Sequence, residues 1–126
     1  MKDLLNISRV VRACRFSWQG LRHAARHEPA FRQELAVAAF ALPLGLYLGQ
    51  GGVEKAVLAA SIMLVLLTEI LNTAIEAVVN RISTEQHPLS GLAKDLGSAA
   101  VFLALVLAAL VWGLILWPQL AALWTP

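Results

Sequence analysis

The sequence predicts an all-α membrane protein, in which an N-terminal amphipathic helix lies on the membrane surface and three transmembrane helices follow it. Of its 126 residues, 59% are hydrophobic and only 14% are charged, whereas about a quarter of the residues in a soluble protein are charged. Three spans of roughly 20 residues each would take up about half of this length. We therefore expect a single membrane domain covering residues 1–126.

The surface helix is expected over residues 4–27. At helical spacing its apolar residues form one stripe, and its arginines gather on the opposite face. This distribution is typical of a helix that lies among lipid headgroups, and a plain membrane anchor would show it too. Phe16 falls among the arginines, where its ring could stack on a base or bend into the interface. The apolar stripe consists of Ile7, Val10, Val11, Cys14, Trp18, Leu21 and Ala25.

The first transmembrane helix is expected over residues 29–49. No charged residue occurs between Glu34 and Glu54, and the run LAVAAFALPLGLYLG is apolar enough for a membrane interior. Pro43 lies inside this run and can bend the helix. A glycine-rich loop, residues 49–52, is expected to follow.

The second transmembrane helix is expected over residues 53–82, and it has to carry acidic side chains into the membrane. Only 13 uncharged residues separate Lys55 from Glu69, which is fewer than the roughly 20 needed to cross a hydrocarbon core of about 30 Å. The crossing segment must therefore include Glu69. At helical spacing four polar residues share one face of this helix: Glu69, Asn72, Thr73 and Glu76.

These intramembrane acids predict a functional site. Each costs at least about 2.5 kcal/mol on insertion scales, so such residues usually face protein, water or an ion. A structural network between helices is the alternative, and it accounts for Asn72 better than for two acids. Two further acids, Glu28 and Glu34, stand at the start of the first span.

The acids and the nearby cations suit phosphoryl transfer. Mg²⁺ commonly takes one or two carboxylates together with substrate phosphates, so Glu28 and Glu76 could hold the ion between two helices. Glu69 could then accept a proton from a hydroxyl group while cations neutralise the phosphate charge. Proton or cation transport would also use buried acids, without an evident need for the cations. The basic residues suited to phosphate oxygens are Arg9, His87 and Lys94.

The third transmembrane helix is expected over residues 90–118, because no charged residue follows Asp95. No P-loop or protein-kinase signature occurs in the chain. The candidate phosphate-binding segment is HPLSGLAKDLGSAAV, where Gly91 would allow close backbone approach at the helix start and Lys94 would lie on the first turn. Ordinary helix capping would give the same pattern. The tryptophans placed for an interfacial belt are Trp112, Trp117 and Trp124.

The positive charges predict a cytoplasmic N-terminus, a cytoplasmic loop over residues 83–95 and an outward C-terminus. Lys55 alone lies on the opposite side. The first 30 residues contain no apolar run long enough for a signal-peptide core, so we expect no cleavage there. The basic residues on the cytoplasmic side are Lys2, Arg9, Arg12, Arg15, Arg22, Arg26, Arg32, Arg81 and Lys94.

In these same segments the sequence resembles the prokaryotic diacylglycerol kinase family, whose members are small trimeric membrane kinases. EILNTAIEAVVNRI resembles the signature Glu-x-Leu-Asn-Ser/Thr-Ala-Ile-Glu-x-x-Val-Asp, and RACRFSWQGLRHA, EPAFRQE and SGLAKDLGSAAV fall in the expected order. The resemblance covers nearly the whole chain. It implies transfer of the γ-phosphoryl group of ATP to the primary hydroxyl of diacylglycerol in the bacterial inner membrane. It also implies a homotrimer with active sites between subunits.

The resemblance further implies roles for single residues. Glu69 would be the general base, Glu28 and Glu76 would bind the Mg²⁺ that accompanies ATP, and Lys94 would bind phosphate. We place Asn72 of the signature with the catalytic residues. The nucleotide-binding residues would be Arg9, Phe16, Ser17, Glu28, Glu76, Glu85, Gln86, His87, Lys94 and Asp95. The lipid-binding residues would be Arg9, Phe31, Glu34, Glu69, Ser98 and Trp112, to which we add Trp18.

The chain departs from the family pattern at three positions. Asn80 replaces the final aspartate of the signature, Phe16 stands where a tyrosine is common, and Pro88 follows His87. We expect activity to survive, because the missing aspartate affects a structural ion pair more than the chemistry. Some family members prefer undecaprenol, which is the alternative acceptor. Outside the family, the competing hypotheses are a small proton- or cation-handling subunit and a structural assembly protein; no nucleic-acid partner is expected.

Overall fold

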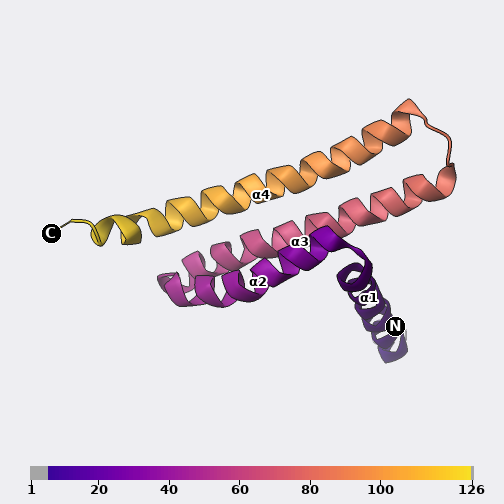
Figure 1. Cartoon of the computed structure of the whole chain (residues 1–126). Helices are drawn as coiled ribbons and strands as arrows, with labels where there is room; N and C mark the ends of the chain where they lie inside the picture. The colour runs from indigo at the N-terminus through magenta and orange to yellow at the C-terminus, as the bar shows by residue number, and fades with distance from the viewer. Residues whose placement is uncertain (1–5, 126) are drawn as a thin grey trace.

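The computed structural model describes residues 6–125, and four helices account for nearly all of them (Figure 1). Within these residues there is no strand, so the predicted all-α fold with an N-terminal helix is confirmed. Lys2 and residues 4–5 of the predicted surface helix lie outside the described residues. The helices are α1 (Ile7–His27), α2 (Pro29–Leu48), α3 (Gly51–Ile82) and α4 (Pro88–Ala122).

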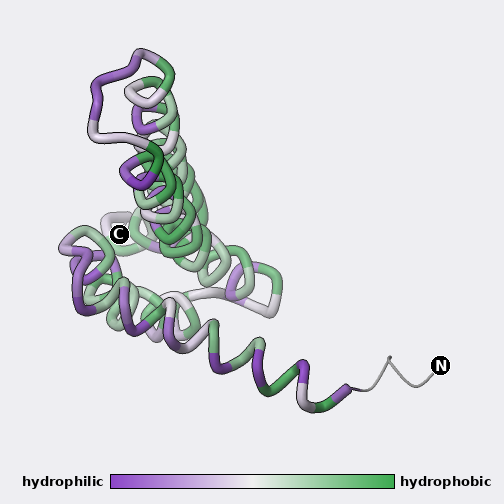
Figure 2. The backbone as a smooth tube through the Cα atoms, turned by 90° about the vertical axis from the view of Figure 1, so that its right-hand side faces the viewer, coloured by the Kyte–Doolittle hydropathy of each residue, from purple (hydrophilic) through white to green (hydrophobic). Residues whose placement is uncertain are grey.

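The helices α2, α3 and α4 form the body of the molecule, and α1 leads away from it at a steep angle (Figure 1). α2 lies along the first half of α3, and α4 returns along α3, so consecutive helices in the body run antiparallel. Polar and apolar residues alternate along the turns of α1, whereas α4 is apolar over most of its length (Figure 2). This distribution fits a surface helix joined to helices that contact lipid.

The junction of α1 and α2 is a single residue, Glu28. Its backbone is extended, with φ −104° and ψ 106°, as is favoured for a residue that precedes proline. Pro29 then begins α2, where a missing N–H group leaves no helical hydrogen bond unmade. The sequence Glu-Pro therefore fixes Glu28 at the corner between the surface helix and the helical body.

The loop between α2 and α3 is shorter than predicted. Only Gly49 and Gln50 separate the two helices, and Gly51 and Gly52 belong to α3. Gly51 has φ +81°, a left-handed conformation that glycine adopts readily. The Gln50 N–H donates to Glu54 Oε2 at 2.7 Å, which ties the turn to the first turn of α3.

The start of α4 also differs from the prediction. α4 begins at Pro88, because proline is favoured at the first helical position and His87 Nδ1 accepts a hydrogen bond from the Leu89 N–H at 3.1 Å. Gly91 therefore lies inside the first turn, and nothing lies within 4 Å of a Cβ atom placed there. The predicted position of Lys94 on the first turn is wrong, because the earlier start of α4 places it on the second turn.

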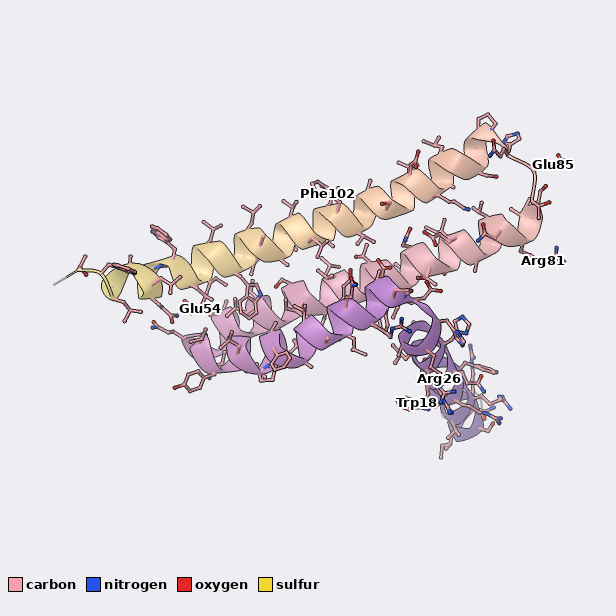
Figure 3. The ribbon with its side chains drawn as sticks, in the orientation of Figure 1. Trp18, Arg26, Glu54, Arg81, Glu85 and Phe102 are labelled. Atoms are coloured by element: carbon pink, nitrogen blue, oxygen red, sulfur yellow. The ribbon has the colours of Figure 1, made fainter. Side chains whose placement is uncertain are left out.

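Small residues make many of the contacts between helices, and most large apolar side chains other than Phe31 and Leu58 face outward. Val65 of α3 forms a buried cluster with Ala104 and Ala108 of α4. Phe40 is 81% exposed, and Figure 3 shows Phe102 pointing away from α3 on the outer face of α4. Small residues let helices approach closely where the surroundings are as apolar as the core, so this arrangement fits a chain surrounded by lipid.

Two helices, α3 and α4, are long and apolar enough to cross a membrane, and most of their residues are exposed. α2 has 20 residues but does not reach the same hydropathy, since Arg32, Gln33 and Glu34 stand near its start. The number of spans and their orientation remain predictions.

Replacing Gly45 by leucine should destabilise the packing of α2 against the other helices. A Cβ atom at Gly45 would lie 3.2 Å from Leu58 Cβ and 3.2 Å from two ring atoms of Trp112, and overpacking typically costs about 1–3 kcal/mol. Gly113→Leu is the matched control, because nothing lies within 4 Å of a Cβ atom there. Thermal unfolding in detergent micelles measures both variants, and equal melting temperatures would contradict the packing described here.

Candidate active site

The polar face predicted on α3 is present, and its central residues are buried. Glu69 is 7% exposed and Asn72 is 9% exposed, whereas Thr73 and Glu76 are partly buried. Asn72 Nδ2 donates a hydrogen bond to Glu76 Oε1 at 3.2 Å. Two of the predicted catalytic residues and one predicted metal ligand therefore lie together on one helix face.

Four carboxylates stand on the two elements that meet in this region: Glu69 and Glu76 on α3, and Glu28 and Glu34 at the start of α2. Glu34 Oε2 is buried and has no hydrogen-bond partner among residues 6–125. Of these four acids, Glu28 and Glu76 line the same cavity.

A cavity of about 470 Å³ lies between the end of α1 and α3, and we call it the acidic cavity. Glu28 and Glu76, the two predicted metal ligands, both line it. His23 lines it as well, and its ring lies beside that of His27, with centroids 4.6 Å apart and the ring planes inclined by 39°. His23 was not predicted as a site residue, because a histidine on a basic surface helix carries no motif.

The acidic cavity suits a metal ion that arrives together with phosphates. In the part of the chain that the structure describes, no group of three or more His, Cys, Asp or Glu side chains is arranged to hold a metal ion. A pair of carboxylates is nevertheless the usual protein contribution to an Mg²⁺ site whose other ligands are water and substrate phosphates. Glu28 and Glu76 provide such a pair, and Asn72 supports one of them.

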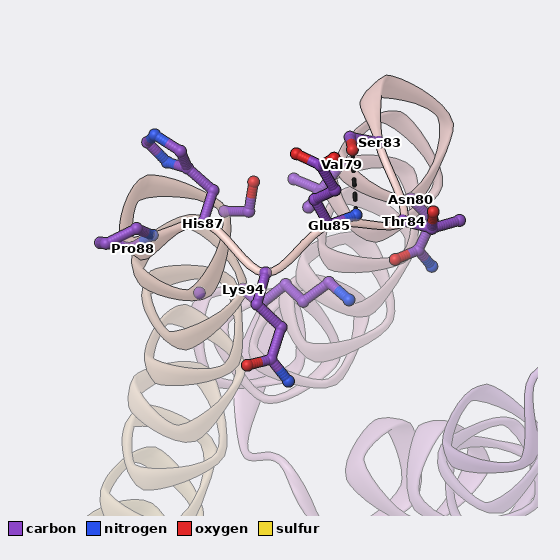
Figure 4. A pocket seen from close by; sticks show the side chains of 11 residues that line it. Val79, Asn80, Ser83, Thr84, Glu85, His87, Pro88 and Lys94 are labelled. Carbon is purple, nitrogen blue, oxygen red and sulfur yellow. Dashed lines mark hydrogen bonds between the residues drawn. The ribbon is translucent and has the colours of Figure 1, made fainter.

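A second cavity, of about 800 Å³, lies between the end of α3 and the start of α4, and we call it the loop cavity. Lys94 extends from α4 into the space between the two helices (Figure 4). The Glu85 N–H donates to Ser83 Oγ at 2.9 Å, which shapes the connecting loop. Four predicted nucleotide-binding residues line this cavity: Glu85, Gln86, His87 and Lys94.

The predicted nucleotide-binding residues of α1 lie elsewhere. Arg9 and Ser17 line a cavity of about 530 Å³ along α1, together with Trp18. Phe16 is exposed, and Asp95 is exposed on α4 outside the loop cavity. Within one chain, eight of the ten expected nucleotide-binding residues are thus divided among the α1 cavity, the acidic cavity and the loop cavity, and Phe16 and Asp95 line none of the three.

The predicted lipid-binding residues are brought together only in part. Glu34 and Trp112 line an apolar groove of about 400 Å³ between α2, α3 and α4. Phe31 is buried and lines a neighbouring apolar cavity of about 520 Å³. Arg9 and Ser98 line neither of these two cavities. The groove thus has a carboxylate towards the start of α2 and an indole ring towards the end of α4.

Ser61, which the sequence did not single out, holds the Trp112 ring in place. Trp112 Nε1 donates to Ser61 Oγ at 3.1 Å, and the Ser61 hydroxyl donates to the Leu58 carbonyl at 2.8 Å. Ser61 is buried in α3, 51 residues before its partner in α4. No local pattern could have predicted this pair, because the register between two helices decides it.

Comparison with known proteins identifies the family. The family model described as prokaryotic diacylglycerol kinase matches residues 15–116. The chain belongs to this family. It is similar to the diacylglycerol kinase of Escherichia coli K12, with 46% identity over 87% of this chain and 90% of that protein. It is also similar to the diacylglycerol kinases of Haemophilus influenzae (44% identity, 92% and 98% covered) and Pseudomonas aeruginosa (41%, 91% and 94%).

Membership in the prokaryotic diacylglycerol kinase family confirms the resemblance inferred from the sequence motifs. The chain is therefore a kinase that transfers a phosphoryl group to an alcohol group. This result favours an enzyme over the transport subunit and the assembly protein, which were the competing hypotheses. The buried acids of α3 accordingly belong to a phosphotransferase.

Replacing Ser61 by alanine should destabilise the protein by about 1–3 kcal/mol, because the part-buried Trp112 N–H would lose its acceptor. Thr68→Ala is the control, since the Thr68 hydroxyl donates to the Leu64 carbonyl of its own helix at 2.7 Å. The readout is the melting temperature in detergent micelles. In a Trp112→Phe background Ser61→Ala should cost less, and an unchanged cost there would argue against a direct coupling.

Proposed function

We propose that this kinase uses ATP to phosphorylate diacylglycerol to phosphatidic acid at the cytoplasmic face of the bacterial inner membrane. The single observation that carries the proposal is the burial of Glu69 on a polar face of α3, within the influence of Glu28 and Glu76. The relatives described above are all named diacylglycerol kinases, which favours diacylglycerol over undecaprenol as the acceptor.

The depth of these acids supports a site at the membrane boundary. At a rise of 1.5 Å per residue, Glu69 lies about 21 Å along α3 from Lys55, and Glu76 lies about 32 Å from it. A hydrocarbon core is about 30 Å thick. With Lys55 at the outer boundary, Glu69 falls inside the core near its cytoplasmic edge, and Glu76 falls at that edge. A lipid hydroxyl can reach Glu69 from the membrane, and phosphates dissolved in water can reach Glu76.

In the proposed reaction, Glu69 accepts the proton of the lipid hydroxyl, and the hydroxyl oxygen attacks the γ-phosphorus of ATP. A new oxygen–phosphorus bond forms, the bond from the γ-phosphorus to the bridging oxygen breaks, and ADP leaves. Lys94 neutralises charge on the phosphates. Asn72 holds the Glu76 carboxylate through the hydrogen bond at 3.2 Å. No covalent intermediate with the enzyme is needed.

Glu28 and Glu76 are the residues proposed to hold Mg²⁺, since both line the acidic cavity. The bound ion would supply positive charge beside the phosphates, which lowers the repulsion felt by an incoming oxygen. The Glu-Pro corner keeps Glu28 opposite α3, and the hydrogen bond from Asn72 restricts Glu76. These two constraints are what the chain itself contributes to ion binding.

We further propose a homotrimer with active sites between subunits. The support is the division of eight of the ten predicted nucleotide-binding residues among three cavities of one chain, together with the exposed apolar faces of α2 and α4. A neighbouring copy could bring a second set of these residues to the acidic cavity. The nucleotide-binding residues proposed are Arg9, Phe16, Ser17, Glu28, Glu76, Glu85, Gln86, His87, Lys94 and Asp95, and the lipid-binding residues are Arg9, Trp18, Phe31, Glu34, Glu69, Ser98 and Trp112.

The proposed topology has three spans, with the N-terminus and the loop cavity in the cytoplasm and the C-terminus outside. Figure 3 shows Arg81 and Glu85 at one end of the α3–α4 pair and Glu54 towards the other. The arginines of α1 and Arg81 then lie on the same side, in agreement with the positive-inside rule.

Replacing Glu69 by glutamine should lower kcat by about 10²- to 10⁴-fold, the range expected for loss of a general base. Purified protein in mixed micelles would be given γ-labelled ATP and diacylglycerol, and labelled phosphatidic acid would be counted. Glu54→Gln is the control, because Glu54 lies at the opposite end of α3 from the loop cavity.

The same assay separates the alternatives. Full turnover by Glu69→Gln would show that another group is the base. Preferential labelling of undecaprenol offered beside diacylglycerol would correct the acceptor, and no labelling of either lipid by the unaltered chain would refute the proposed reaction.

A further inference from the structure

α3 and α4 approach each other closely at Gly97. Gly97 is buried in α4. A Cβ atom placed on it would overlap with Asn72 Oδ1 and lie 3.3 Å from Asn72 Cγ. Residue 97 therefore has to be glycine for Asn72 to keep its present conformation, although glycine is an unfavourable residue inside a helix.

The conformation of Asn72 matters because the two ends of its amide group have opposite roles. Nδ2 donates to Glu76 Oε1 at 3.2 Å, and an ionised carboxylate accepts hydrogen bonds but cannot donate them. Oδ1 is therefore directed to the backbone of α4 at Gly97, where it is buried without a hydrogen-bond partner among residues 6–125. A rotated amide would lose the bond to Glu76, and a flipped amide would place Oδ1 against a carboxylate oxygen.

The burial of Asn72 Oδ1 without a partner is unfavourable by itself. This unpaired oxygen lies against Gly97, where a larger residue in α4 would push the Asn72 amide away from Glu76. The Asn72–Glu76 bond is thus set by a contact between two helices and not by α3 alone.

We propose that Gly97 is a positioning residue for phosphoryl transfer. By leaving space for Asn72 Oδ1, it fixes the direction of the Asn72 amide, and through that amide the direction of the Glu76 carboxylate. The inference rests on the proposed function, in which Glu76 holds the metal ion. Substitution of a residue that orients a metal ligand without contacting the metal typically lowers metal affinity or activity by about 10- to 100-fold.

Gly97→Ala tests this inference against Gly113→Ala. Both positions are in α4, and nothing lies within 4 Å of a Cβ atom at Gly113. Backbone propensity predicts that both changes stabilise the helix. We expect Gly97→Ala to raise the Mg²⁺ concentration for half-maximal rate by about tenfold or more and to lower kcat, while the KM for diacylglycerol stays within about twofold. Gly113→Ala should leave all three quantities unchanged.

Glu76→Gln is measured in parallel, so that the proposed metal role of Glu76 and the proposed positioning role of Gly97 can be tested separately. If Glu76→Gln does not change the Mg²⁺ dependence, the proposed metal role of Glu76 is wrong. If Glu76→Gln changes it and a folded Gly97→Ala protein does not, the positioning role of Gly97 is wrong.

A further variant keeps the inference testable if Gly97→Ala fails to fold. In Gly97→Ala combined with Asn72→Ala, the added methyl group no longer meets an amide. The double variant should then recover the melting temperature and the oligomeric state of Asn72→Ala alone. A double variant that remains unfolded would show that Gly97 is required by the backbone packing and not by Asn72, and this outcome would overturn the proposal.

Discussion

A carboxylate carried into a hydrocarbon core costs at least about 2.5 kcal/mol, and in the proposed topology α3 carries Glu69 there. The cost is acceptable only where the acids face protein, water or a cation. The fold meets this condition by turning the polar face of α3 inward, towards the Glu-Pro corner on one side and Gly97 on the other. The positions of α1, α2 and α4 around α3 can be understood from this requirement.

The packing differs between the two ends of the molecule. At the end that contains the α2–α3 turn, Trp112 is bonded to Ser61, and Gln119 Nε2 donates to the Leu48 carbonyl at 2.9 Å. Both hydrogen bonds join different helices and hold that end together. At the other end, residues 83–89 are exposed, and the loop cavity opens between α3 and α4. Hydrogen bonds between helices thus hold one end together, and the other end leaves a cavity beside the predicted nucleotide-binding residues.

Periodicity and charge predicted most of the local structure. The polar face of α3 could be found because its four residues follow the helical repeat, and the boundary between the surface helix and the first span was placed at residue 28. The start of α4 was placed two residues too late, at residue 90, whereas the helix begins at Pro88. Gly97 and Ser61 were missed for a different reason. Their roles depend on which turn of α4 lies beside which turn of α3, and neither helix encodes that register by itself.

The two substrates of a lipid kinase come from phases that do not mix, and this fact constrains where the polar face of α3 can lie along the helix. Glu69 and Glu76 are separated by about 10 Å along the helix axis. If the face were moved one turn towards the outer end, Glu76 would be withdrawn from the water that carries the phosphates. If it were moved one turn the other way, Glu69 would lie about 5 Å closer to the cytoplasmic water. In the proposed reaction, the helix rise therefore sets the distance between the two acids, and the contacts of Asn72 with Glu76 and Gly97 set the orientation of the Glu76 carboxylate.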